Sequence, residues 1–288
     1  RMGEMGWLGV AFPEEHGGFG GRFADLALIL EQLGRGLVPE PMIASVVLAG
    51  GLLSRLGSAE QVKTFLEPMI EGRTTLAFAY TERQSRYHLH ECATRAERRG
   101  AGFAISGEKV WVLNGHAADH IVVVARTAGA QSDAAGLSLF VVDANAPGLT
   151  RTRVPTMDGQ RCGLLRFENV EVGADRLLGE ANTALASIEW AIDRGAAAAC
   201  AEGQGAVQEL FERTVAYLKE RKQFGVPIGS FQALQHRAAD MYAETELCKS
   251  SMILAAIEAD DDDDEMRKRE ISTAKLQLGR GGWYVMEN

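Results

Sequence analysis

At a joint between two helical patterns the chain reads Tyr217-Leu-Lys-Glu-Arg221-Lys-Gln-Phe224-Gly225-Val-Pro-Ile-Gly-Ser-Phe-Gln232. An arginine, a Phe-Gly pair and a glutamine stand at fixed spacing there. Phe-Gly is typical of a helix end, because glycine adopts backbone conformations that other residues avoid. Taken alone, the stretch also reads as a helix C-terminus whose basic residues favour the helix dipole. The rest of the chain must therefore show whether this joint also binds a ligand.

Composition limits the classes of protein that the chain can represent. It has 288 residues and a net charge of -9, which argues against a general nucleic-acid binder. Its four cysteines form no CxxC pair, so neither structural zinc nor a disulfide framework is expected, and no other metal site is predicted. We see no signal peptide and no apolar run of about 18 residues, which favours a cytoplasmic protein without a membrane span.

Three blocks of different periodicity follow one another along the sequence. Residues 1–73 show helical periodicity, with a predicted N-cap at Ser58. Residues 74–176 contain short apolar or alternating runs punctuated by Gly, Asn and Asp, and no helix separates them, so we expect an antiparallel barrel or sandwich. Residues 177–288 predict long helices of a bundle. We expect Asp260 to Asp264 to form a solvated loop between two of these helices that also favours the next N-terminus.

Both ends of the sequence lie inside such a pattern. The chain opens with Arg1-Met-Gly-Glu-Met-Gly-Trp and stops in a helical pattern at Asn288. We therefore expect a piece of a longer protein, in which the first and last domains are incomplete.

Three further stretches stand beside the joint, at Met5–Gly20, Ala77–Glu82 and Gly107–Gly115. They read Met-Gly-Trp-Leu-Gly-Val-Ala-Phe-Pro-Glu-Glu-His-Gly-Gly-Phe-Gly, Ala-Phe-Ala-Tyr-Thr-Glu and Gly-Glu-Lys-Val-Trp-Val-Leu-Asn-Gly. Together the four resemble signatures of the acyl-CoA dehydrogenase family and cover nearly the whole chain. The resemblance implies an α+β fold with an N-terminal helical domain, a central antiparallel β-domain and a C-terminal helical bundle.

The same resemblance implies which residues bind FAD. The strand end at Phe78, Tyr80 and Thr81 would hydrogen-bond the flavin ring, and Trp111 would pack on it. Leu113 stands where the family has a threonine that hydrogen-bonds the flavin, so that hydroxyl is lost here. Without the resemblance, Trp111 is also compatible with core packing alone.

At the joint, the resemblance assigns contacts to the rest of the cofactor. Arg221 would contact the FAD pyrophosphate, Phe224 would pack near it and Gln232 would meet the adenosine, all from the neighbouring subunit of a dimer. A guanidinium suits this role because its fork of donors matches phosphate oxygens and it stays charged.

One loop departs from the family pattern. Where Pro-x-x-Gly-Ser-Asp is common, this chain has Arg83-Gln-Ser-Arg86-Tyr87-His88, similar to a subgroup that resembles the small subunit of pimeloyl-CoA dehydrogenase. Arg86 and Tyr87 are therefore candidate substrate-binding residues, and a dicarboxylyl or bulky acyl group is implied. A surface role for Arg86 fits the sequence equally well.

No catalytic residue is assigned. The expected base, a Glu in a Gly-rich segment, would lie beyond Asn288, and Glu287 does not match it. Where other members carry the base on the long helix, this chain has Gly195, and the family arginine that contacts CoA falls at Ala196. Asp193 and Glu189 fit structural or solvated roles better.

The implied activity is FAD-dependent α,β-dehydrogenation of an acyl-CoA in fatty-acid metabolism, with electrons passing to an electron-transfer flavoprotein. The protein would form a homo- or hetero-oligomer, a dimer or tetramer. The alternatives are a non-catalytic partner subunit, a flavin monooxygenase on the same fold and a truncated, inactive product.

Overall fold

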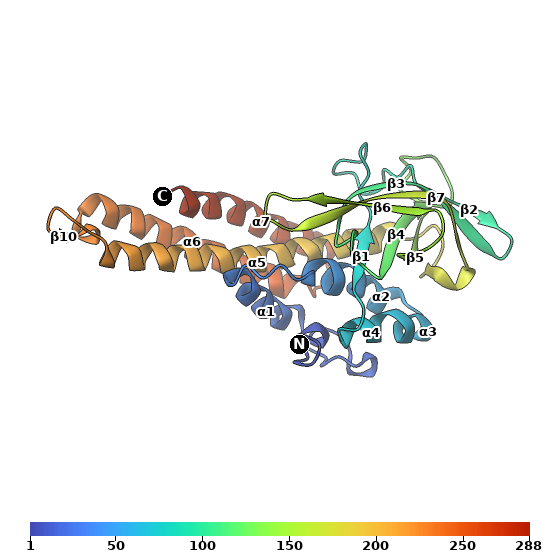
Figure 1. The fold of residues 1–288 in the computed structure, drawn as a ribbon, viewed down its shortest axis with the longest axis horizontal. Coiled ribbons are helices and arrows are strands. Elements are labelled where there is room, and N and C mark those ends of the chain that lie inside the picture. Colours follow the sequence, from blue (N-terminus) through green and yellow to red (C-terminus); the bar gives the residue numbers. More distant parts are fainter. The chain divides into compact units, whose positions relative to one another are not determined.

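A computed structural model describes residues 1–288 (Figure 1). The chain forms two compact units, and each is described by itself. One comprises residues 1–21 and 39–192, and the other comprises residues 22–38 and 193–288. The boundary falls within the long helix α5 (Leu185–Glu220).

Short helices occupy the N-terminal part of the first unit. They are η1 (Trp7–Gly9), η2 (Glu14–His16), η3 (Met42–Gly50), α2 (Gly51–Leu56), α3 (Ala59–Gln61), η4 (Val62–Leu66) and α4 (Glu67–Ile70). The predicted N-cap is confirmed, because the Ser58 hydroxyl accepts the Gln61 N–H at 3.2 Å and the Gln61 side chain accepts the Ser58 N–H at 3.0 Å.

One eight-stranded sheet follows these helices. Its strands are β1 (Leu76–Ala79), β2 (Arg95–Arg99), β3 (Gly102–Leu113), β4 (His120–Arg126), β5 (Leu137–Asp143), β6 (Leu149–Pro155), β7 (Arg161–Val172) and β8 (Leu177–Leu178), and η5 (Ala174–Arg176) precedes β8. The order is β6-β7-β3-β2-β4-β5-β8, and β1 also pairs with β4. Its core contains Ile105, Ile121, Phe140, Val142 and Leu165, all at most 2% exposed.

The prediction of an antiparallel sheet was wrong at β4, which lies inside the sheet. Strands β1 and β2 both pair with β4 in parallel, in the registers Phe78↔Val122 and Arg95↔Arg126. Parallel neighbours need a long crossover, commonly a helix. Here the segment from β1 to β4 contains the β2–β3 hairpin instead, so a parallel pair forms without a helix.

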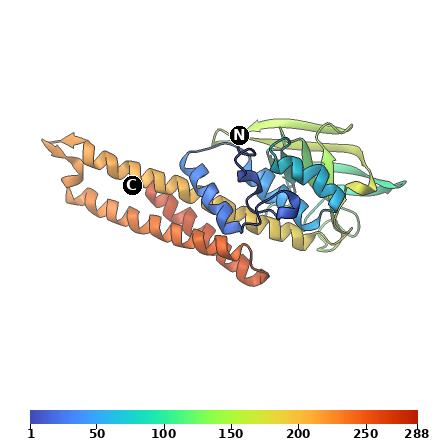
Figure 2. The same cartoon turned by 90° about the horizontal axis from the view of Figure 1, so that it is seen from below.

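Four helices make up the second unit: α1 (Phe23–Arg35), the greater part of α5, α6 (Gln232–Glu258) and α7 (Asp264–Glu287). Helices α6 and α7 run side by side in opposite directions (Figure 2). Glycines let α1 approach α5 closely. A Cβ at Gly34 would lie 1.8 Å from the Glu202 carbonyl oxygen, and one at Gly205 would lie 1.8 Å from that of Glu31.

The acidic loop between α6 and α7 differs in part from the prediction. Asp263 caps α7 as expected, since its carboxylate accepts the Glu265 and Met266 N–H groups at 2.9 and 3.0 Å. Asp260, in contrast, is not merely solvated. Its carboxylate accepts the Phe23 N–H at 2.7 Å and the Arg194 guanidinium at 2.6 Å, so it ties the start of α1 to α5.

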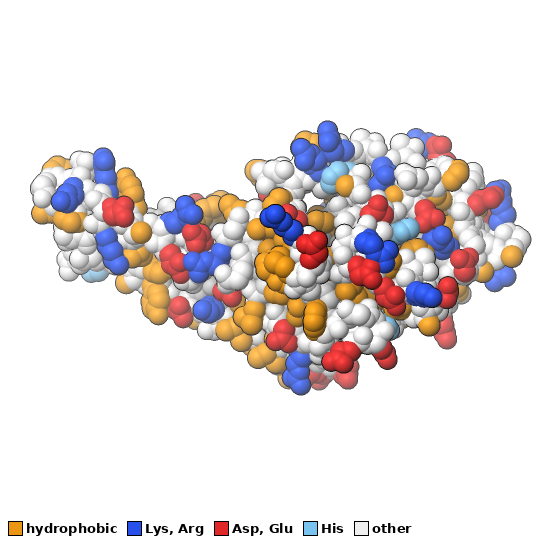
Figure 3. Space-filling model, turned by 60° about the horizontal axis from the view of Figure 1, so that its bottom comes forward, with side chains coloured by type: hydrophobic (Ala, Val, Ile, Leu, Met, Phe, Trp, Pro, Cys, Tyr) orange, Lys and Arg blue, Asp and Glu red, His pale blue; other side chains and the backbone are white.

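The helical unit leaves large apolar side chains at its surface. Tyr217, Leu247, Ile257, Leu276 and Trp283 are all more than half exposed. Hydrophobic atoms are visible on this unit in the space-filling view (Figure 3). No helix combines the length and the apolar composition that a membrane crossing requires.

Candidate functional site

The end of β1 presents the first group of predicted residues. Phe78 is buried, and its ring stacks on that of the half-buried Tyr80 with centroids 5.1 Å apart. The Thr81 carbonyl accepts the Val110 N–H at 2.9 Å. This bond joins the end of β1 to the stretch of β3 that carries Trp111.

Trp111 lies in a β-bulge. The pairing of β3 with β7 slips between Lys109 and Val112, and Trp111 has a φ of 54°. A bulge redirects side chains, and a positive φ is uncommon for a bulky residue. Trp111 and Leu113 are 59% and 48% exposed, whereas Val112 between them is buried. Positions 111 and 113 therefore share an exposed face of β3, and Trp111 is not packed in the core of this chain.

We call Phe78, Tyr80, Thr81, Trp111 and Leu113 the rim. A buried ion pair lies beside it, because Lys109 hydrogen-bonds the Tyr80 carbonyl. Lys109 Nζ is 2.7 Å from Glu82 Oε1, and the two side chains are 0% and 3% exposed. Burial by itself raises the pKa of Glu82, but the Lys109 ammonium and hydrogen bonds from Lys109, Thr94 and Ala93 outweigh it and lower that pKa to about 2. The Glu82 carboxylate therefore stays ionised at neutral pH. Burial also raises the pKa of the neighbouring Cys92 thiol.

The loop after Glu82 exposes the two candidate substrate residues. The Ser85 hydroxyl accepts the Glu82 N–H at 3.0 Å and donates to the Glu82 carbonyl at 2.9 Å, which closes a tight turn. Arg86 follows with a φ of 47°. Arg86 is exposed and Tyr87 is 96% exposed. Both side chains are thus available to a ligand.

The joint of the helical unit has the geometry that its sequence predicts. Helix α5 ends at Glu220, a hairpin of β9 (Lys222–Gln223) and β10 (Val226–Pro227) follows, and η6 (Ile228–Ser230) leads to α6, which begins at Gln232. Phe224 and Gly225 have φ values of 53° and 83°, as a tight hairpin turn requires.

The predicted side chains of the joint face solvent. Phe224 is 92% exposed, its ring lies 6.1 Å from that of Phe231, and Arg221 and Gln232 are also exposed. Arg221 has no carboxylate partner within the chain. The predicted residues therefore form two groups, one at the β1–β3 rim of the first unit and one at the joint of the second.

The polar residues of α5 have structural partners. Arg194 donates to the Ala259 carbonyl at 3.1 Å and lies over the Phe23 ring, with its guanidinium carbon 4.6 Å from the ring centroid. Asp193 accepts from the buried Arg267 at 3.3 Å. These contacts hold Arg194 and Asp193 within the helical unit, and Gly195 has no carboxylate that could act as a base.

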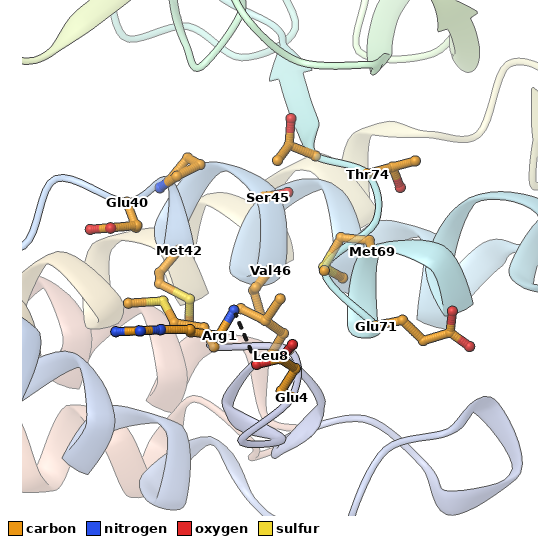
Figure 4. Close-up of a pocket in the computed structure, with 15 residues that line it drawn as sticks. Arg1, Glu4, Leu8, Glu40, Met42, Ser45, Val46, Met69, Glu71 and Thr74 are labelled. Carbon is orange, nitrogen blue, oxygen red and sulfur yellow. Dashed lines mark ion pairs between the residues drawn. The ribbon is translucent and has the colours of Figure 1, made fainter.

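A separate cavity of about 390 Å³ lies in the first unit (Figure 4). Apolar side chains of Leu8, Met42, Val46 and Met69 line it together with three glutamates. The Ser45 hydroxyl in its wall accepts the Leu76 N–H at 2.7 Å, which connects the wall to the start of β1. None of the predicted site residues lines this cavity.

Known proteins resemble this chain along nearly its whole length. Three family models match it, the acyl-CoA dehydrogenase N-terminal domain at residues 1–73, the middle domain at 77–170 and the C-terminal domain at 185–288. The probable acyl-CoA dehydrogenase YngJ of Bacillus subtilis is 34% identical over 261 residues, which are 89% of this chain and 69% of that protein. The chain belongs to the acyl-CoA dehydrogenase family.

Two other similar proteins extend the comparison. The caffeyl-CoA reductase–Etf complex subunit CarC of Acetobacterium woodii is 29% identical over 265 residues, covering 89% of this chain and 69% of that protein. A glutaryl-coenzyme A dehydrogenase solved in complex with glutaryl-CoA superposes with a TM-score of 0.92 and 26% identity, covering 99% of this chain and 75% of that one. The predicted α+β fold is confirmed.

Membership makes the chain an oxidoreductase that uses FAD. The residues present fit that cofactor. The exposed indole of Trp111 offers an aromatic face to a flat ring, and the exposed guanidinium of Arg221, unpaired within the chain, suits a pyrophosphate. Leu113 supplies no hydroxyl, so any hydrogen bond there must come from the backbone.

Two features of this region have no signal in the local sequence. The Lys109–Glu82 pair joins residues 27 positions apart, so no local motif reveals it. The bulge at Trp111 depends on how β3 pairs with β7, which alternation alone cannot predict.

Proposed function

We propose that the chain binds FAD with two surfaces and catalyses α,β-dehydrogenation of an acyl-CoA thioester. The rim formed by Phe78, Tyr80, Thr81, Trp111 and Leu113 would hold the flavin ring. The joint at Arg221, Phe224 and Gln232 would hold the pyrophosphate and adenosine of a cofactor bound to a second copy. The observation that carries the proposal is the Trp111 bulge, which exposes 59% of a large aromatic residue beside the end of β1.

The chemistry requires two bonds at the acyl chain to break. FAD, when bound, would supply the acceptor for the hydride from Cβ, and the proton from Cα would go to a base that is not assigned among residues 1–288. The chain's own residues orient the ring and exclude water. Trp111 would cover one face of the ring, and the backbone at Tyr80 and Thr81 would fix its polar edge.

Arg86 and Tyr87 would meet the substrate beside this site. The guanidinium of Arg86 is suited to a carboxylate or phosphate, which it can bind through two hydrogen bonds. This supports an acyl-CoA that carries an anionic or bulky acyl group. Arg86→Ala should raise the KM for such a substrate more than it changes kcat, and an unchanged KM would remove the assignment.

Electrons would pass to an electron-transfer flavoprotein. This is supported by the similarity to CarC, whose name places it in a complex with Etf. The assembly would be an oligomer, since the joint lies at the exposed end of the helical unit and carries apolar side chains such as Phe224.

A second candidate is a non-catalytic partner subunit that binds FAD. It is favoured by α5, where Gly195 cannot act as a base and Asp193 is engaged by Arg267. Anaerobic mixing of the FAD-loaded protein with a series of acyl-CoA esters separates the two. Bleaching of the flavin supports the dehydrogenase, and a flavin that stays oxidised with every ester supports the partner subunit.

Oxygen consumption in the same titration tests the monooxygenase alternative. Fast reoxidation of the reduced flavin by O₂, with an oxygenated product, would replace the dehydrogenase proposal. Slow reoxidation by O₂ and fast reoxidation by an electron-transfer flavoprotein would support it.

A further inference from the structure

The buried pair of Lys109 and Glu82 has no role among the flavin contacts proposed above. Burying an ammonium and a carboxylate costs solvation that their mutual attraction only partly returns, and an apolar pair of similar volume is often at least as stable. Such a pair is therefore weak evidence for a purely stabilising role. What it holds in place is more informative.

Lys109 connects three segments of the first unit. Its Nζ donates to Glu82 Oε1 at 2.7 Å, to the Tyr80 carbonyl at 3.3 Å and to Cys92 Sγ at 3.6 Å. No apolar side chain could hydrogen-bond the Tyr80 carbonyl in this way. The end of β1 is thus fixed by a donor that comes from β3.

Glu82 extends the network to the turn before β2. Its carboxylate accepts the Ala93 N–H at 2.7 Å and the Thr94 N–H at 3.0 Å, and the Cys92 thiol lies 3.3 Å from Oε1. Both carboxylate oxygens therefore accept hydrogen bonds, and the pair belongs to a network whose buried polar groups have partners.

The network lies next to the strained residue of the rim. Lys109 is the last residue of β3 in regular register before the bulge, and the next residue, Val110, donates its N–H to the Thr81 carbonyl at 2.9 Å. Trp111 then adopts its φ of 54°. A non-glycine residue keeps such a conformation only where its surroundings determine it.

We infer that Lys109 and Glu82 are positioning residues of the flavin site, which hold the Tyr80–Thr81 rim and the Trp111 bulge in the geometry that receives the flavin ring. They do not touch the cofactor. The inference rests on the proposed function, because it assigns the rim to the flavin. The pKa of about 2 for Glu82 agrees with it, since the carboxylate that accepts these hydrogen bonds is ionised at neutral pH.

The test compares three variants of the FAD-loaded chain: Lys109→Met, Glu82→Gln and, as a control, Arg176→Met. Arg176 belongs to the same unit and pairs with Asp143 at 3.1 Å, but it makes no contact with the network. We would measure the FAD dissociation constant, the visible absorption and circular dichroism of the bound flavin, and the melting temperature of each.

Lys109→Met and Glu82→Gln should raise the FAD dissociation constant on the order of 10-fold or more, by analogy with the loss of outer residues that orient metal ligands. They should also change the flavin circular dichroism. Arg176→Met should lower the melting temperature yet leave FAD affinity and spectrum as in the parent. FAD affinity and flavin spectrum unchanged in both network variants would overturn the inference.

A second readout does not depend on the cofactor. The fluorescence of Trp111 in the apoprotein is obtained by subtracting the spectrum of the matching Trp111→Phe protein. Lys109→Met should shift this emission, and Arg176→Met should not. An unshifted emission would count against the positioning role, even if the parent bound no FAD and the proposed function had failed.

A conservative variant keeps the test possible if Lys109→Met fails to fold. If Lys109→Met does not fold, Lys109→Arg keeps the charge and should retain FAD binding to a greater degree than Glu82→Gln. Equal binding by Lys109→Arg, Glu82→Gln and the parent would also overturn the inference.

Discussion

We predict how the Lys109–Glu82 pair makes the free energy of unfolding depend on pH. Glu82 has a pKa of about 2 in the folded protein against 4.5 for the ordinary carboxyl. At about 1.4 kcal/mol per pH unit this difference corresponds to roughly 3 kcal/mol of folding free energy. Because the folded pKa is the lower one, that stability is fully present above pH 4.5 and is lost as the pH falls towards 2.

Lys109→Met removes the partner and leaves the Glu82 carboxylate buried. A buried charge that loses its partner costs about 3–5 kcal/mol at pH 7. In the variant only the hydrogen bonds from Thr94 and Ala93 still oppose the effect of burial, so the pKa of Glu82 should rise above its value in the parent, and protonation relieves the penalty as the pH falls. The stability gap between parent and variant should therefore be widest near pH 7 and narrow towards pH 3.

Urea denaturation followed by circular dichroism between pH 3 and 8 measures this gap. The double variant Lys109→Met/Glu82→Gln is the matched control, and its gap to Lys109→Met alone should shrink on acidification. A stability gap between parent and variant that is below about 1 kcal/mol at pH 7, or the same at every pH, would show that the unpaired Glu82 carboxylate does not destabilise the variant.

Three further predictions concern other parts of the chain. Arg221→Ala should weaken FAD retention by about 1.5–3 kcal/mol, measured as the dissociation constant, because it removes a charged hydrogen bond to phosphate; equal retention would refute that role. Trp111→Gly should lower FAD affinity, because it removes the aromatic face that is proposed to cover the flavin ring; an unchanged dissociation constant would contradict it. Gly34→Ala should destabilise the helical unit by about 2 kcal/mol or more, since the new Cβ meets a carbonyl of α5, whereas Gly279→Ala, with nothing within 4 Å, should stabilise it by about 0.5–1 kcal/mol; thermal melts of the two should move in opposite directions.

Local sequence patterns predicted the parts of the fold that depend on local physics. Strands β4 and β5 are among the short, mostly apolar runs by which the sequence predicts a β-domain, and every residue of β5 except Asp143 is buried. The joint was predicted because Phe224-Gly225 carries its own turn geometry. Strands β2 and β6 gave no such signal, since most of their residues are polar and at least partly exposed.

Features set by distant pairing could not be predicted in the same way. The bulge that exposes Trp111 arises where β3 meets β7, and the ion pair beneath it joins Lys109 to Glu82 across 27 positions. The same holds for Asp260, whose partners Phe23 and Arg194 lie far away in the sequence. The motifs indicated FAD, but the contacts that hold the proposed flavin rim in place are the non-local ones of Lys109 and Glu82.

The flavin content and the redox response of the purified protein decide whether it is an FAD-dependent dehydrogenase. We predict a yellow protein with bound FAD whose visible absorption is bleached by an acyl-CoA in the absence of oxygen, with Arg221→Ala losing FAD more readily. A protein that takes up no FAD, or whose FAD no acyl-CoA reduces, would contradict the proposed dehydrogenase.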